Sequence, residues 1–285
     1  MEGKVLRQGR TIYKINFFYL GVLIWSILVQ FFPIPFNAYQ YVSLLIPISI
    51  YLFINKEHGE RILKPNLLNL KSIIIIIAVW TCMLPIIVTI INIYTKLFGN
   101  TIANIIAEDS NSTFIGNLIF TAITPAILEE TLMRGIILDG YRYKSRFVAA
   151  IMNGFMFGML HLNSFQFFHT FVAGFVASYL VFATNSIYAG MIIHFINNSF
   201  PIFIDYLYPP NPNVDYASNP SLFTIIMSIV FSILVVHTLI RLLAKINNID
   251  FSKKEETSDE KIFNKPLIIS IFLFIAFSIV LISLL

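Results

Sequence analysis

The chain has 285 residues, of which 57% are hydrophobic and only 12% are charged. The charged share is about half that of an ordinary soluble domain, which excludes a water-soluble globular fold. A formal net charge of +4 would suit a nucleic-acid-binding protein. The basic residues are instead placed in loops between apolar segments, so we expect no nucleic acid partner.

A helix that crosses a hydrocarbon core of about 30 Å needs about 20 apolar residues, and the sequence contains about nine such runs. We therefore predict an all-α fold, a polytopic transmembrane helix bundle of about eight to nine membrane helices around a polar intramembrane cavity. Residues 1–285 would form a single integral membrane domain. In chain order the runs are 15–33, 38–54, 72–94, 113–138, 147–162, 165–184, 187–205, 221–243 and 266–285.

The first run follows four basic residues, Lys4, Arg7, Arg10 and Lys14, as the apolar part of a signal peptide would. Its apolar part is as long as a full crossing, and no small-residue cleavage site follows it. We interpret this run as a retained membrane anchor.

The loops between the runs differ strongly in charge. Of the 19 Lys and Arg residues, 17 lie in alternate loops: four before the first run, four in 55–71, three in 139–146 and six from 241 to 265. The opposite loops contain only Lys96. The positive-inside tendency predicts that the amino terminus lies in the cytoplasm and the carboxyl terminus outside.

The fourth run, 113–138, contains Glu129, Glu130 and Arg134. A charge near the middle of a membrane helix costs about 2.5–3.5 kcal/mol on insertion scales, so such residues are rare and usually functional. Glu130 and Arg134 are four residues apart and predict an ion pair, whereas Glu129 points about 100° away and would be free for chemistry. A purely structural ion pair that joins helices is the alternative. Pro125 predicts a kink that opens backbone groups just before the pair.

The fifth run contains Gly154 and Gly158, whose spacing predicts close approach of a second helix. His161 follows about one turn later. From the helical rise of about 1.5 Å per residue, Glu129 and His161 each lie about 20 Å from the turn near Arg142. Antiparallel packing of their helices would therefore place the two residues at the same depth, as acid–base partners require.

In the seventh run, His194 and Asn198 share a helix face and could donate two hydrogen bonds to one developing oxyanion. The alternative is that each simply bonds a neighbouring helix. By the same count His194 lies only about 10 Å from the cytoplasmic end, which disagrees with the depth of the first two residues. His169 is a further candidate, because it can approach His161, whereas His237 is expected to be interfacial.

Several protease chemistries leave no trace in the sequence. There is no His-Glu-x-x-His zinc motif and no Gly-x-Ser nucleophile turn. No pair of Asp residues occupies helix interiors as an aspartyl dyad requires. The remaining protease chemistry is one in which a glutamate acts together with a histidine.

The polar residues form three ordered patterns. They are Glu-Glu-x-x-x-Arg at 129–134, Phe-x-x-x-His at 157–161 and His-x-x-x-Asn at 194–198. Together the patterns resemble the CAAX proteases and bacteriocin-processing enzymes, also called the CPBP or Abi family of intramembrane proteases. The resemblance covers 113–205, which would be the catalytic core.

The resemblance implies an intramembrane endopeptidase with assigned residue roles. Glu129 and His161 would activate a water to attack the scissile carbonyl. His194 and Asn198 would hold the resulting oxyanion, and the ion pair of the first pattern would organise the base. It also leaves open a catalytic zinc held by Glu129, His161 and His194 with an open fourth position. We expect the metal-free mechanism and no cofactor.

The expected partners are a peptide or membrane-protein substrate and the lipid bilayer. A chain rich in Ile, Asn and Lys with no evident organelle signal suggests a bacterial plasma membrane, where relatives serve bacteriocin processing or immunity and a prenylated substrate is not expected. Two alternatives stay open. One is a membrane transporter or proton-coupled carrier, because intramembrane Glu, His and Arg also mark ion pathways. The other is a non-catalytic immunity protein that binds a peptide.

Overall fold

The computed structural model describes residues 11–108, 113–209, 220–252 and 258–283, and all regular structure in these ranges is helical. Three of the elements, η1, η3 and η4, are π-helical, and η2 is a short 3₁₀ turn. In chain order the elements are α1 (Thr11–Val29), α2 (Phe36–Gln40), η1 (Tyr41–Leu45), α3 (Ile46–Ile54), η2 (Lys56–His58), α4 (Gly59–Leu63), α5 (Leu70–Phe98), α6 (Thr101–Glu108), α7 (Phe114–Asn117), η3 (Leu118–Ile123), α8 (Thr124–Glu130), η4 (Thr131–Ile137), α9 (Leu138–Gly140), α10 (Arg146–Leu160), α11 (Ser164–Thr184), α12 (Ile187–Leu207), α13 (Leu222–Ile246) and α14 (Lys265–Ser283).

Within the described ranges, seven helical stretches are long and apolar enough to cross a membrane. They are α1, the continuous stretch 37–54, α5, α11, α12, α13 and α14. The prediction of an all-helical membrane protein is confirmed. Two of the nine predicted runs differ from a long continuous span: α10 has only 15 residues, and the run that carries the two glutamates is divided into five successive helical pieces, α7 to α9.

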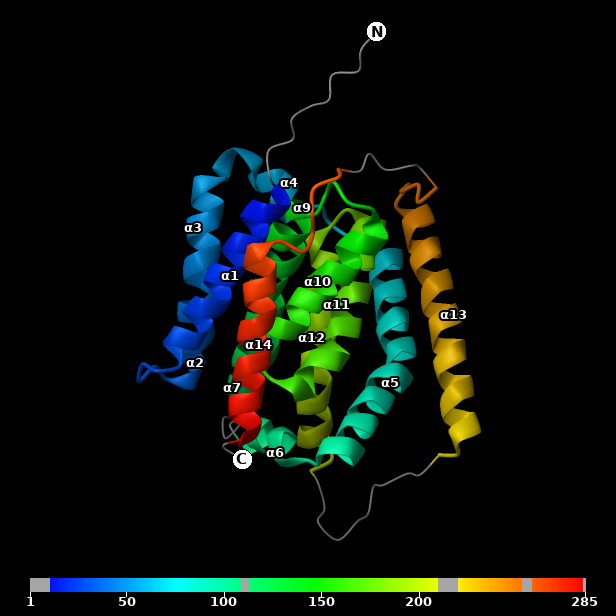
Figure 1. Ribbon diagram of the computed structural model, residues 1–285. Coiled ribbons are helices and arrows are strands. Elements are labelled where there is room, and N and C mark those ends of the chain that lie inside the picture. Colours follow the sequence, from blue (N-terminus) through cyan, green and yellow to red (C-terminus); the bar gives the residue numbers. More distant parts are fainter. Residues whose placement is uncertain (1–10, 109–112, 210–219, 253–257, 284–285) are drawn as a thin grey trace.

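The helices form a bundle with α10, α11 and α12 at its centre (Figure 1). In Figure 1, α1, α3 and α14 lie on one side of this centre, and α5 and α13 lie on the other. One hydrophobic cluster joins α1, η4, α10 and α14, and a second joins α5, α11, α12 and α13. The segment α7–α9 packs against α12, which brings the glutamates toward the bundle centre.

Helices α10 and α11 form a tight antiparallel pair. A β-carbon added to Gly154 would lie 2.5 Å from the carbonyl oxygen of Phe171, and one added to Gly158 would lie 2.8 Å from that of Phe167. Real β-carbons essentially never approach so closely, so the two glycines allow the backbones to touch. This confirms the close approach that their spacing predicted.

The basic loops meet at one end of the bundle, the upper end in Figure 1. Arg61 Nε lies 3.1 Å from Asp139 Oδ1 and thereby connects 55–71 to the end of α9. Lys144 Nζ donates to the carbonyl oxygen of Ser258 at 2.5 Å. These contacts place three of the four basic segments together, as one side of a membrane requires.

Candidate active site

The two glutamates end α8, which lies between the π-helical segments η3 and η4. Such wider turns are frequent at functional sites. Pro125 lacks the N–H group that, in an α-helix, would bond to the carbonyl of Thr121. Asn198 Nδ2 donates to this carbonyl oxygen at 3.0 Å. Pro125 therefore leaves a backbone acceptor open before the pair, as predicted, and Asn198 on α12 satisfies it.

The predicted ion pair between Glu130 and Arg134 is present. Arg134 Nη1 lies 2.8 Å from Glu130 Oε1, and both side chains are only 1% exposed. The guanidinium carbon also lies 4.4 Å from the ring centroid of Phe157, within cation–π distance. Two glycines make room for the pair: a β-carbon on Gly190 would collide with the Glu130 carboxylate, and one on Gly174 would lie 3.2 Å from Arg134 Nη2.

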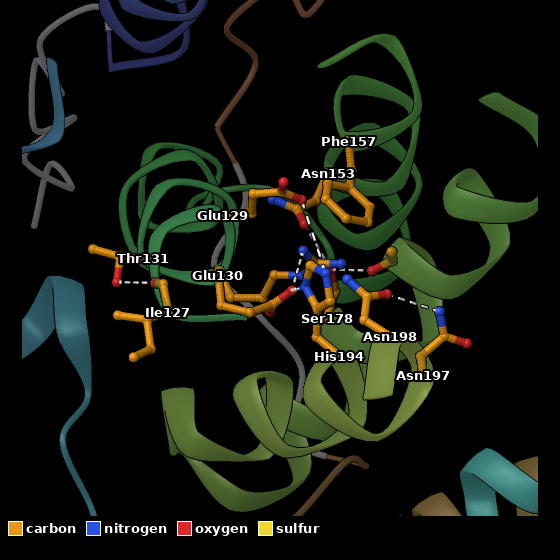
Figure 2. A network of polar contacts seen from close by, with 12 residues as sticks. Ile127, Glu129, Glu130, Thr131, Asn153, Phe157, Ser178, His194, Asn197 and Asn198 are labelled. Atoms are coloured by element: carbon orange, nitrogen blue, oxygen red, sulfur yellow. Dashed lines mark hydrogen bonds and ion pairs between the residues drawn. The ribbon is translucent and has the colours of Figure 1, made fainter. Parts of the chain in front are cut away.

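His194 joins the same pair. Its Nδ1 lies 2.9 Å from Glu130 Oε1, and its Nε2 lies 3.9 Å from Glu129 Oε2 (Figure 2). A carboxylate paired with an arginine accepts hydrogen bonds, so we assign the Nδ1 proton to His194. Glu130 thus connects the arginine to the histidine and turns Nε2 toward Glu129. The sequence predicted the ion pair but not this third member.

The predicted depth of His194 was wrong because α12 does not begin level with the turn near Arg142. Ile187, the first residue of α12, lies beside Gly135: a β-carbon there would be 3.5 Å from Ile187 Cδ1. The Ile187 N–H donates to the carbonyl oxygen of Lys64 at 3.1 Å. Helix α12 therefore starts deeper in the bundle than its place in the sequence suggests, and His194 reaches the level of the glutamates.

His161 directly follows the last residue of α10 and has its own partner. Its Nδ1 lies 3.0 Å from the carbonyl oxygen of Phe157. A carbonyl can only accept, so Nδ1 donates and Nε2 is left as an acceptor. The Phe157 ring stands edge-on to both histidines, with centroids 5.0 Å from His161 and 5.8 Å from His194. Phe157 thereby holds the two imidazoles apart across the site.

One cavity of about 350 Å³ contains the whole set. The six residues predicted from the sequence, Glu129, Glu130, Arg134, His161, His194 and Asn198, all line it. His169 lines the same cavity, as its approach to His161 predicted. His237 instead lines a separate groove beside α13.

Asn153 is a buried supporting residue that the sequence analysis missed. It is fully buried, its Nδ2 donates to the carbonyl oxygen of Met133 in η4 at 2.6 Å, and its Oδ1 accepts from Ser178 Oγ at 3.0 Å. It therefore ties α10 to the π-helical segment and to α11 (Figure 2). The signal was available, because Asn153, Phe157 and His161 are spaced four apart and share one helix face.

The residues do not form a ready metal site. In the part of the chain that the structure describes, no three His, Cys, Asp or Glu side chains are grouped so that they could hold a metal ion. Within the suggested zinc triad, Nδ1 of His161 is bonded to a carbonyl and Nδ1 of His194 to Glu130. These bonds hold each imidazole by Nδ1 and leave Nε2 free of them, the arrangement in which a histidine can also bind a metal. The absence of a metal from the reaction is therefore part of the proposal and not a finding.

Residues 111–200 match the family model described as type II CAAX prenyl endopeptidase Rce1-like. A search of curated proteins and a search of solved structures each gave no match. The matched range contains all three sequence patterns, and the structure brings their residues to one cavity inside a helical membrane bundle. The chain therefore contains, at residues 111–200, a domain of the Rce1-like type II CAAX prenyl endopeptidase family, a family of intramembrane endopeptidases.

Proposed function

We propose that the chain hydrolyses a peptide bond of a peptide or membrane protein with a water that Glu129 activates, without a metal. The observation that carries this proposal is the state of the Glu129 carboxylate. Its Oε2 is buried and has no hydrogen-bond partner within the described ranges. It faces His194 Nε2 and lines the same cavity as His161. Glu130 Oε2 also has no hydrogen-bond partner within the described ranges, but Glu130 differs from Glu129 because its Oε1 already holds both Arg134 and His194.

In the first step, the Glu129 carboxylate takes a proton from the water. The acceptor Nε2 of His161 orients the same water by accepting a hydrogen bond from its second O–H. The water oxygen then bonds to the scissile carbonyl carbon, and the π electron pair moves onto the carbonyl oxygen. When the intermediate collapses, the C–N bond breaks and Glu129 returns its proton to the leaving nitrogen.

The oxyanion needs donors that are already in place. In its imidazolium form, His194 keeps its Nδ1 bond to Glu130 and gains an Nε2–H that points into the cavity. This form also balances charge, because two carboxylates then face one guanidinium and one imidazolium. Asn198 gives one amide hydrogen to Thr121, and its second amide hydrogen is assigned to the oxyanion.

The test of the base is Glu129→Gln, which keeps the shape of the side chain and removes its ability to accept the proton. Purified protein in detergent would be incubated with a defined library of synthetic peptides, and products would be measured by mass spectrometry. Loss of a general base should lower cleavage by about 100-fold or more. The matched control is Glu57→Gln at an exposed position in η2, which should cleave at the parental rate. Full activity of Glu129→Gln, with unchanged thermal stability, would refute the assignment.

We further propose that this activity lies in a bacterial plasma membrane, which the high Ile, Asn and Lys content of the chain supports. There the substrate would be unprenylated, and the activity would serve bacteriocin processing or immunity. Reconstituted protein that transports a solute but cleaves no peptide would favour the carrier instead. Immunity that survives Glu129→Gln would favour a peptide-binding protein without catalysis.

A further inference from the structure

The turn between α10 and α11 lies at membrane depth. Helix α10 has 15 residues, which span about 22 Å at the usual rise, less than the hydrocarbon core of about 30 Å. Irregular backbone at this depth is tolerated only where it is buried in protein or lines a water-filled cavity. In this turn, Asn163 Nδ2 donates to the carbonyl oxygen of His161 at 2.9 Å, and Asn163 Oδ1 accepts from the Gln166 N–H at 2.8 Å. The short hairpin therefore ends in a polar turn beside a hollow.

A second cavity, of about 490 Å³, occupies this hollow between the α10–α11 turn and the α1–η1 segment. We call it the vestibule. It shares part of its lining with the catalytic cavity, so Glu129 and His161 lie where the two cavities meet. Its polar lining includes Ser26, Gln30, Tyr39, Gln40, Ser43 and Gln166.

Two polar atoms of the vestibule lack a partner. Ser26 Oγ and Gln40 Oε1 are buried, and neither has a hydrogen bond within the described part of the chain. An unsatisfied buried polar group costs about 1–3 kcal/mol, so such atoms favour a polar occupant. Gln40 also lines the catalytic cavity beside Glu129. An extended peptide that crosses the junction would present a backbone N–H to Gln40 Oε1.

The vestibule lies at the end of the bundle opposite the basic loops. Helix α1 begins at the basic end, where the Tyr13 N–H donates to Glu260 Oε1 at 2.8 Å. The other end of α1 leads into 30–35, and Gln30 and Ile34 from this link line the vestibule. The described parts of the other basic segments, 55–71, 139–146, 241–252 and 258–265, carry further Lys and Arg residues at this end. Basic loops stay on the cytoplasmic side, so the vestibule is on the other side.

We propose that the vestibule admits the peptide substrate from the extracytoplasmic side and that Gln40 binds the backbone of this peptide next to the scissile bond. The inference rests on the proposed function for the identity of the occupant, because a peptide bond must reach Glu129. The side of entry is inferred from the loop charges and from the position of the vestibule. The substrates would then be secreted peptides or outward-facing segments of membrane proteins.

Sidedness can be tested without measuring activity. Cys82 is the only cysteine, so single-cysteine variants can be made in a Cys82→Ser background. Gln30→Cys at the vestibule and Lys56→Cys at the basic end would be treated with a membrane-impermeant maleimide in intact cells and after permeabilisation. We expect Gln30→Cys to be labelled in intact cells and Lys56→Cys only after permeabilisation. The reverse pattern would overturn the inference.

Substrate entry can be tested with the same peptide library in right-side-out and inverted membrane vesicles, using solubilised protein as the reference. We expect cleavage in right-side-out vesicles and in detergent. Cleavage in inverted vesicles alone would overturn the side of entry but leave the proposed function intact. Absence of cleavage in detergent would instead contradict the proposed function, and the cysteine labelling would still decide the side.

The role of Gln40 is tested by Gln40→Met, which removes the amide at similar side-chain volume. Loss of one hydrogen bond to the substrate should raise KM roughly tenfold while kcat changes little. The control is Asn92→Met on α5, outside both cavities, which should leave KM unchanged. An unchanged KM for Gln40→Met, or an equal fall in kcat, would remove Gln40 from substrate binding.

Discussion

The central residue of the site is Glu130, although it is not the proposed base. It accepts from Arg134 Nη1 at 2.8 Å and lies 2.9 Å from His194 Nδ1. Its side chain is only 1% exposed, so bulk solvent compensates poorly for a lost partner. A buried charge that keeps its partners is stable, whereas one that loses a partner is very costly. The same contact that stabilises Glu130 fixes which nitrogen of His194 faces Glu129.

Arg134→Ala should therefore lower the free energy of unfolding by roughly 3 kcal/mol or more, because it leaves the Glu130 carboxylate buried with only a histidine beside it. The matched control is Arg61→Ala, since Arg61 is 43% exposed and Asp139 keeps Arg142 as a second partner, so this loss should be less than about 1 kcal/mol. Thermal unfolding in detergent would compare the two. Equal losses would contradict the importance of burial.

Whether the protein uses a metal depends on the positions of individual side chains, because a catalytic zinc needs three protein ligands close together. In the described ranges no three His, Cys, Asp or Glu side chains are grouped as metal ligands, and the metal-free mechanism is our proposal. We expect cleavage of the peptide library to be unchanged after dialysis against a strong chelator. Activity that disappears on chelation and returns with zinc would refute the metal-free proposal.

Among the elements, the divided helix α7–α9 decides how the site is built. Pro125 removes one N–H, the adjoining π-helical turns widen the helix, and side chains from neighbouring helices bond to the freed carbonyls. Asn198 bonds to Thr121 in η3, and Asn153 bonds to Met133 in η4. The irregular backbone therefore attaches α10 and α12 to the helix that carries both glutamates.

A double-mutant cycle tests this attachment. Asn198→Ala should cost about 1 kcal/mol of stability, because the Thr121 carbonyl loses its donor. In a Pro125→Ala background the new N–H can bond to that carbonyl, so Asn198→Ala should cost less, with a coupling of about 0.5–1.5 kcal/mol. Additive losses would show that the two residues act separately. Peptide cleavage that stays low in the double variant would support the oxyanion role of Asn198.

In the whole molecule, the distribution of charged residues distinguishes the two ends of the bundle, whereas the hydrophobic clusters join different sets of helices. Basic loops gather at one end, whereas both hydrophobic clusters contribute to the lining of the catalytic cavity, Phe157 from one cluster and Met83 and Ile193 from the other. The end that holds the basic loops is expected to face the cytoplasm. The orientation of the site in the membrane is therefore set by the basic loops, which do not contact the site.

This orientation predicts where the end of α14 lies. In Figure 1, α14 runs from the basic end to the opposite end of the bundle. Alkaline phosphatase fused after α14 should be active in bacterial cells, because it folds only outside the cytoplasm, and a fluorescent protein fused there should stay dark. A bright fluorescent fusion with inactive phosphatase would reverse the orientation.

The sequence by itself determined the membrane class, most of the helices and the candidate residues that the structure brings to one cavity. Long apolar runs have few other stable conformations in a bilayer, and a charge inside such a run is too costly to be accidental. The Glu130–Arg134 pair and the glycine contact between α10 and α11 were also predictable. Both depend on spacing along a single helix.

Only the tertiary structure decided how the helices are placed against one another. The depth of His194 follows from α12 starting beside Gly135, and the histidine's partner is Glu130 rather than a substrate-facing group. The vestibule likewise depends on α10 being short next to α1 and η1. Helical periodicity fixes the face of a residue, but the relative depth of two helices is set by contacts between distant segments, and no local pattern records those contacts.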